Sequence, residues 1–131
     1  MNQPPRTPHT HAWSRWVWLS YWAFAFVLTH APMPGGAHLP VRYVDKIVHF
    51  GLYCLLVLLG GRALAMGTKR LAISTILTWS LVYAGYALVD EWLQQFVGRT
   101  MSAGDWMADA AGILAGTSVL LFVHRTPREQ S

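Results

Sequence analysis

Acidic residues gather at the ends of long apolar stretches in this chain, and a histidine and other polar residues lie among them. A carboxylate in or beside an apolar helix is costly to bury unless it meets a cation, a proton or a ligand. Carboxylates close to an imidazole can perform general acid–base chemistry or bind a divalent cation, and basic side chains among them can bind phosphate. The residues concerned are Asp45, Lys46, His49, Tyr53, Asp90, Glu91, Gln94, Arg99, Asp105 and Asp109.

Residue type suggests a role for each. His49 and Asp105 are the candidate catalytic residues, with His49 as a general base that Asp45 or Asp109 orients. Three carboxylates, Asp90, Glu91 and Asp109, are candidate ligands for a divalent cation such as Mg²⁺ or Ca²⁺. The candidate ligand-binding residues are Asp45, Lys46, Tyr53, Gln94 and Arg99.

Structural roles are the alternative for several of these side chains. Asp45 and Asp105 lie near expected helix starts, where an aspartate can cap the helix and complement its dipole. His49 could serve only to satisfy the carboxylate of Asp109. Asp90 and Glu91 lie near an expected helix end, where the dipole disfavours anions, so capping cannot explain them and each needs a partner.

Three helices must position these residues. Asp45, His49 and Tyr53 are four residues apart and therefore share one helix face. The second face comprises Tyr83, Tyr86, Asp90 and Gln94. The third comprises Asp105, Asp109, Gly112 and Gly116. The small residues of the last face predict close packing against a neighbouring helix, which would bring Asp109 towards the other two faces. Tyr53 and Tyr83 would then form the floor of a small polar pocket.

The composition indicates that these helices lie in a membrane. Hydrophobic residues make up 53% of the 131 residues and charged residues only 12%, whereas soluble globular proteins have about 25% charged residues. The apolar runs are too long and continuous for strands. We therefore expect an all-α fold, a polytopic membrane helical bundle with about four transmembrane helices.

The apolar segments extend over about residues 16–29, 47–64, 71–89 and 106–123. Residues 1–15 are predicted to be a disordered tail, residues 16–124 the transmembrane domain and residues 125–131 a C-terminal tail. The first segment has a second interpretation, a signal peptide cleaved near Thr29-His30-Ala31. Its Trp and Tyr content, and Pro32 directly after that site, favour a retained helix.

The distribution of basic residues predicts the orientation. With both termini in the cytoplasm, seven basic residues lie inside and three outside, as the positive-inside rule favours. The three outer residues are Arg42, Lys46 and Arg99, and the seven inner ones are Arg6, Arg15, Arg62, Lys69, Arg70, Arg125 and Arg128. In this orientation the polar faces of all three helices meet at the outer end of the bundle. The expected location is the cytoplasmic (inner) membrane.

The polar motifs, in this order, resemble the VanZ-like family of small membrane proteins. The matching residues are Asp45-Lys46-Ile47-Val48-His49 with Tyr53, Asp90-Glu91-Trp92-Leu93-Gln94 with Gly98-Arg99, and Asp105 with Gly112 and Gly116. The resemblance covers residues 45–116 and departs from the family pattern at Asp109, where the family usually has Asn. It implies a polytopic membrane protein whose namesake is linked to low-level teicoplanin resistance, and hence a connection with the cell envelope.

Three functions remain open. The first is an envelope protein whose outer pocket binds a lipid head group, with membrane lipids or a lipid-linked envelope precursor as partners. The second is a membrane-embedded hydrolase or transferase acting on such a lipid, with or without a divalent metal. The third is a structural subunit whose polar residues fix the helix register. The acids outnumber the bases at this end, which favours a bound cation or protonation over a bare anion site.

Two classes of function are disfavoured. The net charge is +4, but the basic residues are spread over the ends of the apolar segments, so we expect no nucleic-acid partner. The single cysteine, Cys54, cannot form an internal disulfide or a cysteine-based metal site, and a passive buried thiol is its expected role.

Overall fold

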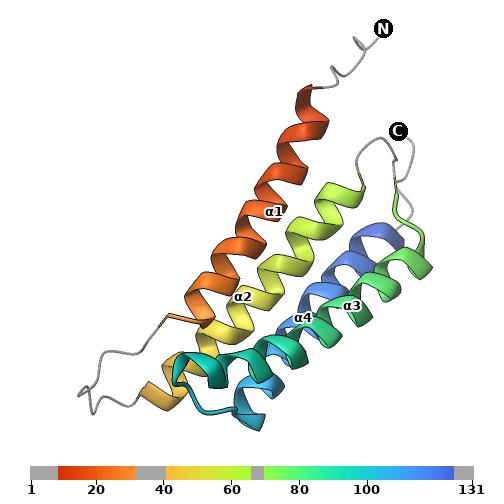
Figure 1. Cartoon of the computed structure of the whole chain (residues 1–131). Coiled ribbons are helices and arrows are strands. Elements are labelled where there is room, and N and C mark those ends of the chain that lie inside the picture. The colour runs from red at the N-terminus through yellow and green to blue at the C-terminus, as the bar shows by residue number, and fades with distance from the viewer. Residues whose placement is uncertain (1–8, 32–40, 66–69, 126–131) are drawn as a thin grey trace, which may run out of the picture.

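A computed structural model describes residues 9–31, 41–65 and 70–125, in which four helices run alternately up and down the long axis of a bundle (Figure 1). They are α1 (His9–Thr29), α2 (Val41–Leu64), α3 (Ile73–Gln94) and α4 (Ala103–Arg125). A short 3-10 helix, η1 (Gln95–Val97), extends the end of α3. The described residues form no strand, which confirms the predicted all-α bundle.

Each helix begins or ends outside the apolar segment from which it was predicted. Thus α1 starts at His9 rather than Trp16, α2 at Val41 rather than Ile47, and α4 at Ala103 rather than Trp106. The predictions followed apolar runs, whereas backbone hydrogen bonds continue a helix through polar residues. Residues 9–15 of the expected tail are therefore helical. The calls on residues 1–8 and 126–131 fall outside the described residues.

Among the described residues, three helices are long and apolar enough to cross a membrane: Tyr43–Leu64, Ile73–Val97 and Ala103–His124. The first helix is not among them, although four membrane helices were expected. Its sequence contains four Trp residues and a Tyr between Trp13 and Trp22, and such side chains favour the membrane–water interface over the hydrocarbon core.

The first helix nevertheless packs as part of the bundle. Trp18 and Ala25 are buried, and the Tyr21 hydroxyl donates a hydrogen bond to the Leu52 carbonyl of α2 at 3.0 Å. Trp22 packs its ring against Tyr83 and Tyr86 of α3. This packing favours the retained-helix interpretation of residues 16–30 over cleavage as a signal peptide.

The closest helix pair is α2 with α4, and two glycines make it possible. A Cβ atom at Gly112 would come within 2.3 Å of the Phe50 carbonyl oxygen, and one at Gly116 within 2.9 Å of the Cys54 carbonyl oxygen. The two helix backbones thus touch, as the spacing of small residues predicted. This contact brings Asp109, one turn before Gly112, against α2.

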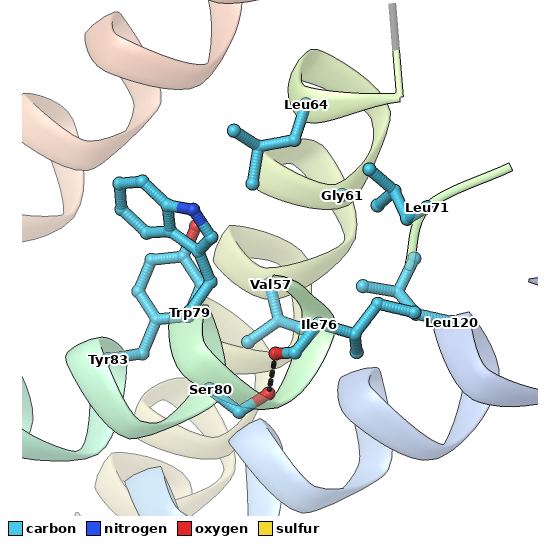
Figure 2. Close-up of a pocket in the computed structure, with 9 residues that line it drawn as sticks. All are labelled: Val57, Gly61, Leu64, Leu71, Ile76, Trp79, Ser80, Tyr83 and Leu120. Atoms are coloured by element: carbon cyan, nitrogen blue, oxygen red, sulfur yellow. Dashed lines mark hydrogen bonds between the residues drawn. The ribbon is translucent and has the colours of Figure 1, made fainter. Parts of the chain in front are cut away.

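At the end of the bundle where α2 finishes, a small apolar pocket lies between α2, α3 and α4 (Figure 2). Its lining includes Val57, Leu64, Ile76 and Leu120. The Ser80 hydroxyl contacts both the Ile76 carbonyl, at 2.8 Å, and the Thr117 hydroxyl of α4, at 2.6 Å. Tyr83 also lines this pocket, so the structure does not place it in the floor of the polar site, where it was expected.

Candidate functional site

The polar residues singled out in the sequence meet at the opposite end of the bundle. There α1 and α3 finish and α2 and α4 begin (Figure 1). Five of these residues are at most 1% exposed, namely His49, Asp90, Glu91, Gln94 and Asp109. We call these five residues the inner layer. Four others, Asp45, Lys46, Arg99 and Asp105, lie around them and form the outer layer.

Two ion pairs make up the outer layer. The Lys46 ammonium donates a hydrogen bond to Asp105 Oδ1 at 2.7 Å, and Arg99 Nη2 lies 3.3 Å from each carboxylate oxygen of Asp45. Each pair joins two different elements of the chain, because Lys46 and Asp45 belong to α2 while Asp105 and Arg99 come later. Both carboxylates of this layer are therefore neutralised by a basic side chain.

Neither aspartate of the outer layer caps its helix. Asp45 lies beyond the first turn of α2, which contains no acidic residue, so a capping role for Asp45 is wrong. Asp105 does lie in the first turn of α4, but the cap there is Ser102, whose hydroxyl accepts a hydrogen bond from the Asp105 backbone N–H at 3.3 Å.

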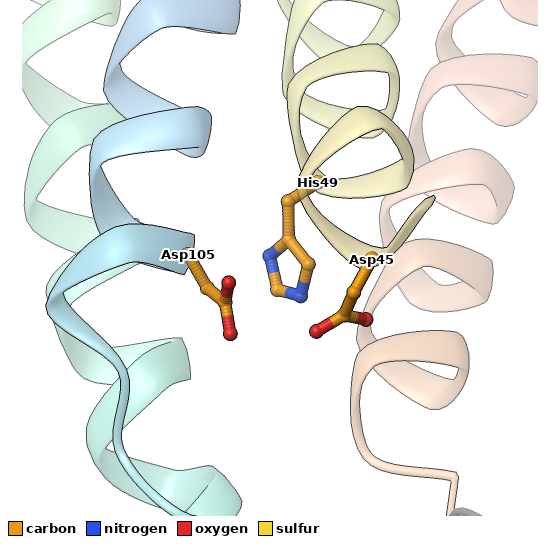
Figure 3. A group of neighbouring side chains, drawn as sticks. All are labelled: Asp45, His49 and Asp105. Carbon is orange, nitrogen blue, oxygen red and sulfur yellow. The ribbon is translucent and has the colours of Figure 1, made fainter. Parts of the chain in front are cut away.

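The centre of the inner layer is a buried pair of His49 and Asp109. His49 Nδ1 lies 2.9 Å from Asp109 Oδ1, and the two side chains are 2% and 0% exposed. The far edge of the imidazole points into the space between Asp45 and Asp105 (Figure 3). His49 therefore connects the inner layer with the outer one.

Asp90, Glu91 and Gln94 of α3 complete the inner layer. The Gln94 amide donates to Asp90 Oδ2 and to Glu91 Oε2, both at 3.4 Å, and the Tyr86 hydroxyl donates to Asp90 Oδ1 at 3.2 Å. Glu91 Oε1 also accepts a hydrogen bond from the Ser102 backbone N–H. Glu91 thereby holds the start of α4, as the glutamate of a capping box does within one helix.

The inner carboxylates lack the basic partners of the outer ones. Within the described part of the chain, no Lys or Arg forms a salt bridge with Asp90, Glu91 or Asp109. Asp109 Oδ2 and the Tyr53 hydroxyl are buried without a hydrogen-bond partner there. Such groups are rare in folded proteins, because an unpaired buried polar atom loses its hydration without compensation.

One member of this site escaped the sequence reasoning. His30, at the end of α1, lies with its Nδ1 atom 3.7 Å from Asp90 Oδ1. Its ring stacks on Phe26, and Nδ1 also lies 2.9 Å from the Phe26 carbonyl oxygen. The sequence marked His30 only as part of a cleavage site. Because the helices alternate in direction, the end of α1 must lie beside the end of α3. This alternation could have indicated that His30 lies near Asp90.

Two sets of side chains have the arrangement needed to hold a metal ion. One comprises Asp45, His49 and Asp105, and the other His49, Glu91 and Asp109; in each set the potential ligand atoms lie within 4.8 Å of one another. Both sets share His49. Asp90, a predicted ligand, belongs to neither set.

Comparison with known proteins gives one match. The family described as VanZ/LLP1 matches residues 5–124, which is most of the chain. No curated protein and no solved structure matches this chain.

Proposed function

The chain belongs to the VanZ/LLP1 family, and we propose that it is an envelope membrane protein whose outer layer binds the phosphate-bearing head group of a lipid. The observation that carries this proposal is the geometry of the two basic side chains. Lys46 and Arg99 come from different elements, each pairs with an aspartate at the polar end of the bundle, and their side chains are 39% and 12% exposed.

Both basic groups keep hydrogen-bond donors for a ligand. Of the donors of Arg99 only those on Nη2 contact Asp45, and of the three ammonium protons of Lys46 one is directed at Asp105. The side chain of Lys46 is 39% exposed, so a phosphate group can reach it without opening the bundle. The start of α4 lies next to this ammonium, and the partial positive charge of a helix N-terminus adds to its attraction for phosphate.

The two outer carboxylates would then select among head groups. Asp45 and Asp105 hold the basic side chains in place and balance their charge, so the outer layer is formally neutral. A zwitterionic head group, with a phosphate and an amine, matches such a layer better than a purely anionic one. Lipid-linked envelope precursors share the phosphate and lie at the same depth.

The position of the site favours a head group over a ligand from the hydrocarbon core. Trp92 is exposed near the polar end and Trp13 and Trp16 near the other end, as expected for side chains at the two membrane interfaces. When α1 is counted as a fourth crossing, because it packs along the other helices, the positive-inside rule directs the polar end outwards and both termini into the cytoplasm. Single Cys replacements of Asp45 or Arg99 should react with an impermeant maleimide added outside intact cells, whereas Arg62→Cys should react only after permeabilisation. The reverse pattern would overturn this orientation.

The lipids that copurify with the protein test the proposal. We expect a phosphate-bearing lipid in purified wild type that is depleted in the Lys46→Gln/Arg99→Gln double variant and retained in Arg62→Gln, which removes an exposed basic residue from the opposite end. Equal lipid content in all three proteins would contradict the proposal.

An enzymatic function is the second candidate, because the pair of His49 and Asp109 has the geometry of a general base and its orienting carboxylate. A hydrolase or transferase acting on the bound lipid would use His49 to activate water or a hydroxyl group. Release of phosphate or of a free head group from the copurifying lipid, lost in His49→Gln, would establish this function. Binding without turnover would exclude it for that lipid.

A further inference from the structure

We propose that His49, Glu91 and Asp109 of the inner layer form a binding site for a divalent cation that takes both nitrogen and oxygen ligands, such as Zn²⁺ or Mn²⁺. This inference goes beyond the proposed function and does not depend on it, since cation binding can be measured whether or not a lipid head group occupies the outer layer.

The geometry requires only small side-chain movements. A cation bound at about 2.1 Å keeps its ligand atoms within about 4.2 Å of one another. The ligand atoms of His49, Glu91 and Asp109 already lie within 4.8 Å of one another, and all three side chains are buried. They come from α2, α3 and α4, so a bound cation would join the three helices.

Charge distinguishes this set from the outer one. Figure 3 shows the set of Asp45, His49 and Asp105. Both of its carboxylates already pair with a basic side chain, Arg99 or Lys46, which a cation would have to displace. Within the described residues, Glu91 and Asp109 have no Lys or Arg partner. Two buried carboxylates without a Lys or Arg partner favour a cation, because the low dielectric of the interior strengthens the attraction.

Two unpartnered groups provide independent support. Asp109 Oδ2 is buried and accepts no hydrogen bond, although Asp109 Oδ1 is paired with His49. Tyr53 is 2% exposed, and its hydroxyl lies beside Asp90 and Asp109 without forming a hydrogen bond of normal geometry. A cation beside Asp109 would satisfy the free carboxylate oxygen, and a water molecule on that cation could reach the hydroxyl.

The donor set indicates the class of cation. Imidazole suits Zn²⁺ and other transition metals, whereas Mg²⁺ and Ca²⁺ favour sites made of oxygen alone. One imidazole with two carboxylates therefore favours Zn²⁺ or Mn²⁺ over the Mg²⁺ or Ca²⁺ expected from the carboxylates by themselves. Asp90 would act as a neighbour that holds Gln94 and Tyr86 rather than as a ligand.

Equilibrium dialysis of the chelator-treated protein in detergent against Zn²⁺ and against Mn²⁺ tests this site. We expect one ion per chain in wild type, at least about a tenfold loss of affinity in Glu91→Gln and in Asp109→Asn, and less than about a threefold change in the control Asp45→Asn. Asp109→Asn should fold, since the amide has the size of the carboxylate and its oxygen can still accept a hydrogen bond from His49. Zn²⁺ should also raise the Tm of wild type and leave that of Asp109→Asn unchanged.

The outcomes separate the two sets. Absence of saturable binding to wild type, or loss of binding in Asp45→Asn with retention in Glu91→Gln, would overturn the inner site. Should a ligand variant unfold, Mn²⁺ bound to wild type labelled with ¹⁵N-histidine provides a second measurement. Electron spin-echo spectroscopy should detect one histidine nitrogen, and its absence would also overturn the site. Lipid binding by the outer layer would survive either result.

Discussion

The two ends of the bundle are built on the same helices and differ in what they bury. At one end, α2, α3 and α4 enclose five ionisable or amide side chains that are almost fully buried. At the other, the same helices enclose aliphatic and aromatic side chains around a small pocket, with one hydrogen bond between Ser80 and Thr117 crossing from α3 to α4.

The difference indicates which end serves stability and which serves function. The apolar end holds one satisfied pair of hydroxyls and two buried polar atoms without a hydrogen-bond partner, the Tyr83 hydroxyl and Trp18 Nε1, but none of the buried Asp, Glu or His side chains of the described residues. The polar end carries four buried polar atoms without a hydrogen-bond partner, on Tyr53, Asp109, His30 and Trp106, and three carboxylates without a Lys or Arg partner in the described residues, all of which cost stability. A membrane protein retains such a cluster where it binds or transforms something.

The largest expected effect concerns the buried pair at the polar end. His49→Ala removes the hydrogen-bonded partner of Asp109 and should cost about 3–5 kcal/mol of unfolding free energy, because it leaves a buried carboxylate unpaired. Unfolding in mixed detergent micelles measures this cost. Adding Asp109→Ala to His49→Ala should recover part of it. A loss below about 1 kcal/mol would show that the pair is accessible to water.

The next largest effect concerns the contact between α2 and α4 at Gly112. Gly112→Ala places a methyl group against the Phe50 carbonyl and should cost about 1–3 kcal/mol by forcing α2 and α4 apart. Gly51→Ala on α2 is the matched control, since no atom lies within 4 Å of its Cβ position. Alanine there should be neutral or stabilising, as alanine favours a helix more than glycine does. Equal losses in both variants would contradict the close packing.

The outer ion pair should matter little for stability. Lys46→Gln removes the pair with Asp105, but the Lys46 side chain is 39% exposed, and exposed pairs contribute at most about 1 kcal/mol. The same variant should nevertheless lose lipid, which separates binding from folding. If Lys46→Gln destabilised the protein as much as His49→Ala, the outer layer would be a structural element and not a binding surface.

The smallest effect belongs to the apolar end. Thr117→Val keeps the shape of the side chain and removes its hydrogen bond to Ser80, which should cost about 0.6 kcal/mol, the average for such bonds between membrane helices. The Ser80 hydroxyl keeps its bond to the Ile76 carbonyl. Micelle unfolding of Thr117→Val beside His49→Ala would sharpen the contrast between the ends. A cost above about 2 kcal/mol would indicate that the apolar end also depends on a buried hydrogen bond for its stability, which would remove the contrast between the two ends.

The sequence predicted the positions of the helices and their meeting point because apolar length and helix periodicity are local properties. The alignment of Asp45 with His49, and of Asp109 with Gly112, depends only on the helical repeat. The small residues of α4 likewise predicted the close approach to α2. The structure has both features, although the helices begin and end at other residues than predicted.

The sequence could not assign partners within the cluster. That Arg99 pairs with Asp45, Lys46 with Asp105 and Glu91 with the backbone of Ser102 depends on how the helices are rotated about their axes. The contribution of His30 was missed for the same reason, because it requires α1 to end beside α3. The sequence predicted α1 as a fourth transmembrane helix, whereas its Trp and Tyr residues lower its hydropathy and it is not among the three candidate spans of the described residues.

Direct titration of lipid binding tests the central claim. Delipidated wild type and the Lys46→Gln/Arg99→Gln variant would be titrated by native mass spectrometry with a phospholipid and with the diacylglycerol that shares its acyl chains. We predict that wild type retains the phospholipid at least about tenfold more strongly than the diacylglycerol, a difference of about 1.4 kcal/mol, and that the double variant loses this preference. Equal retention of both lipids by wild type, or an unchanged preference in the double variant, would contradict a head-group site formed by Lys46 and Arg99.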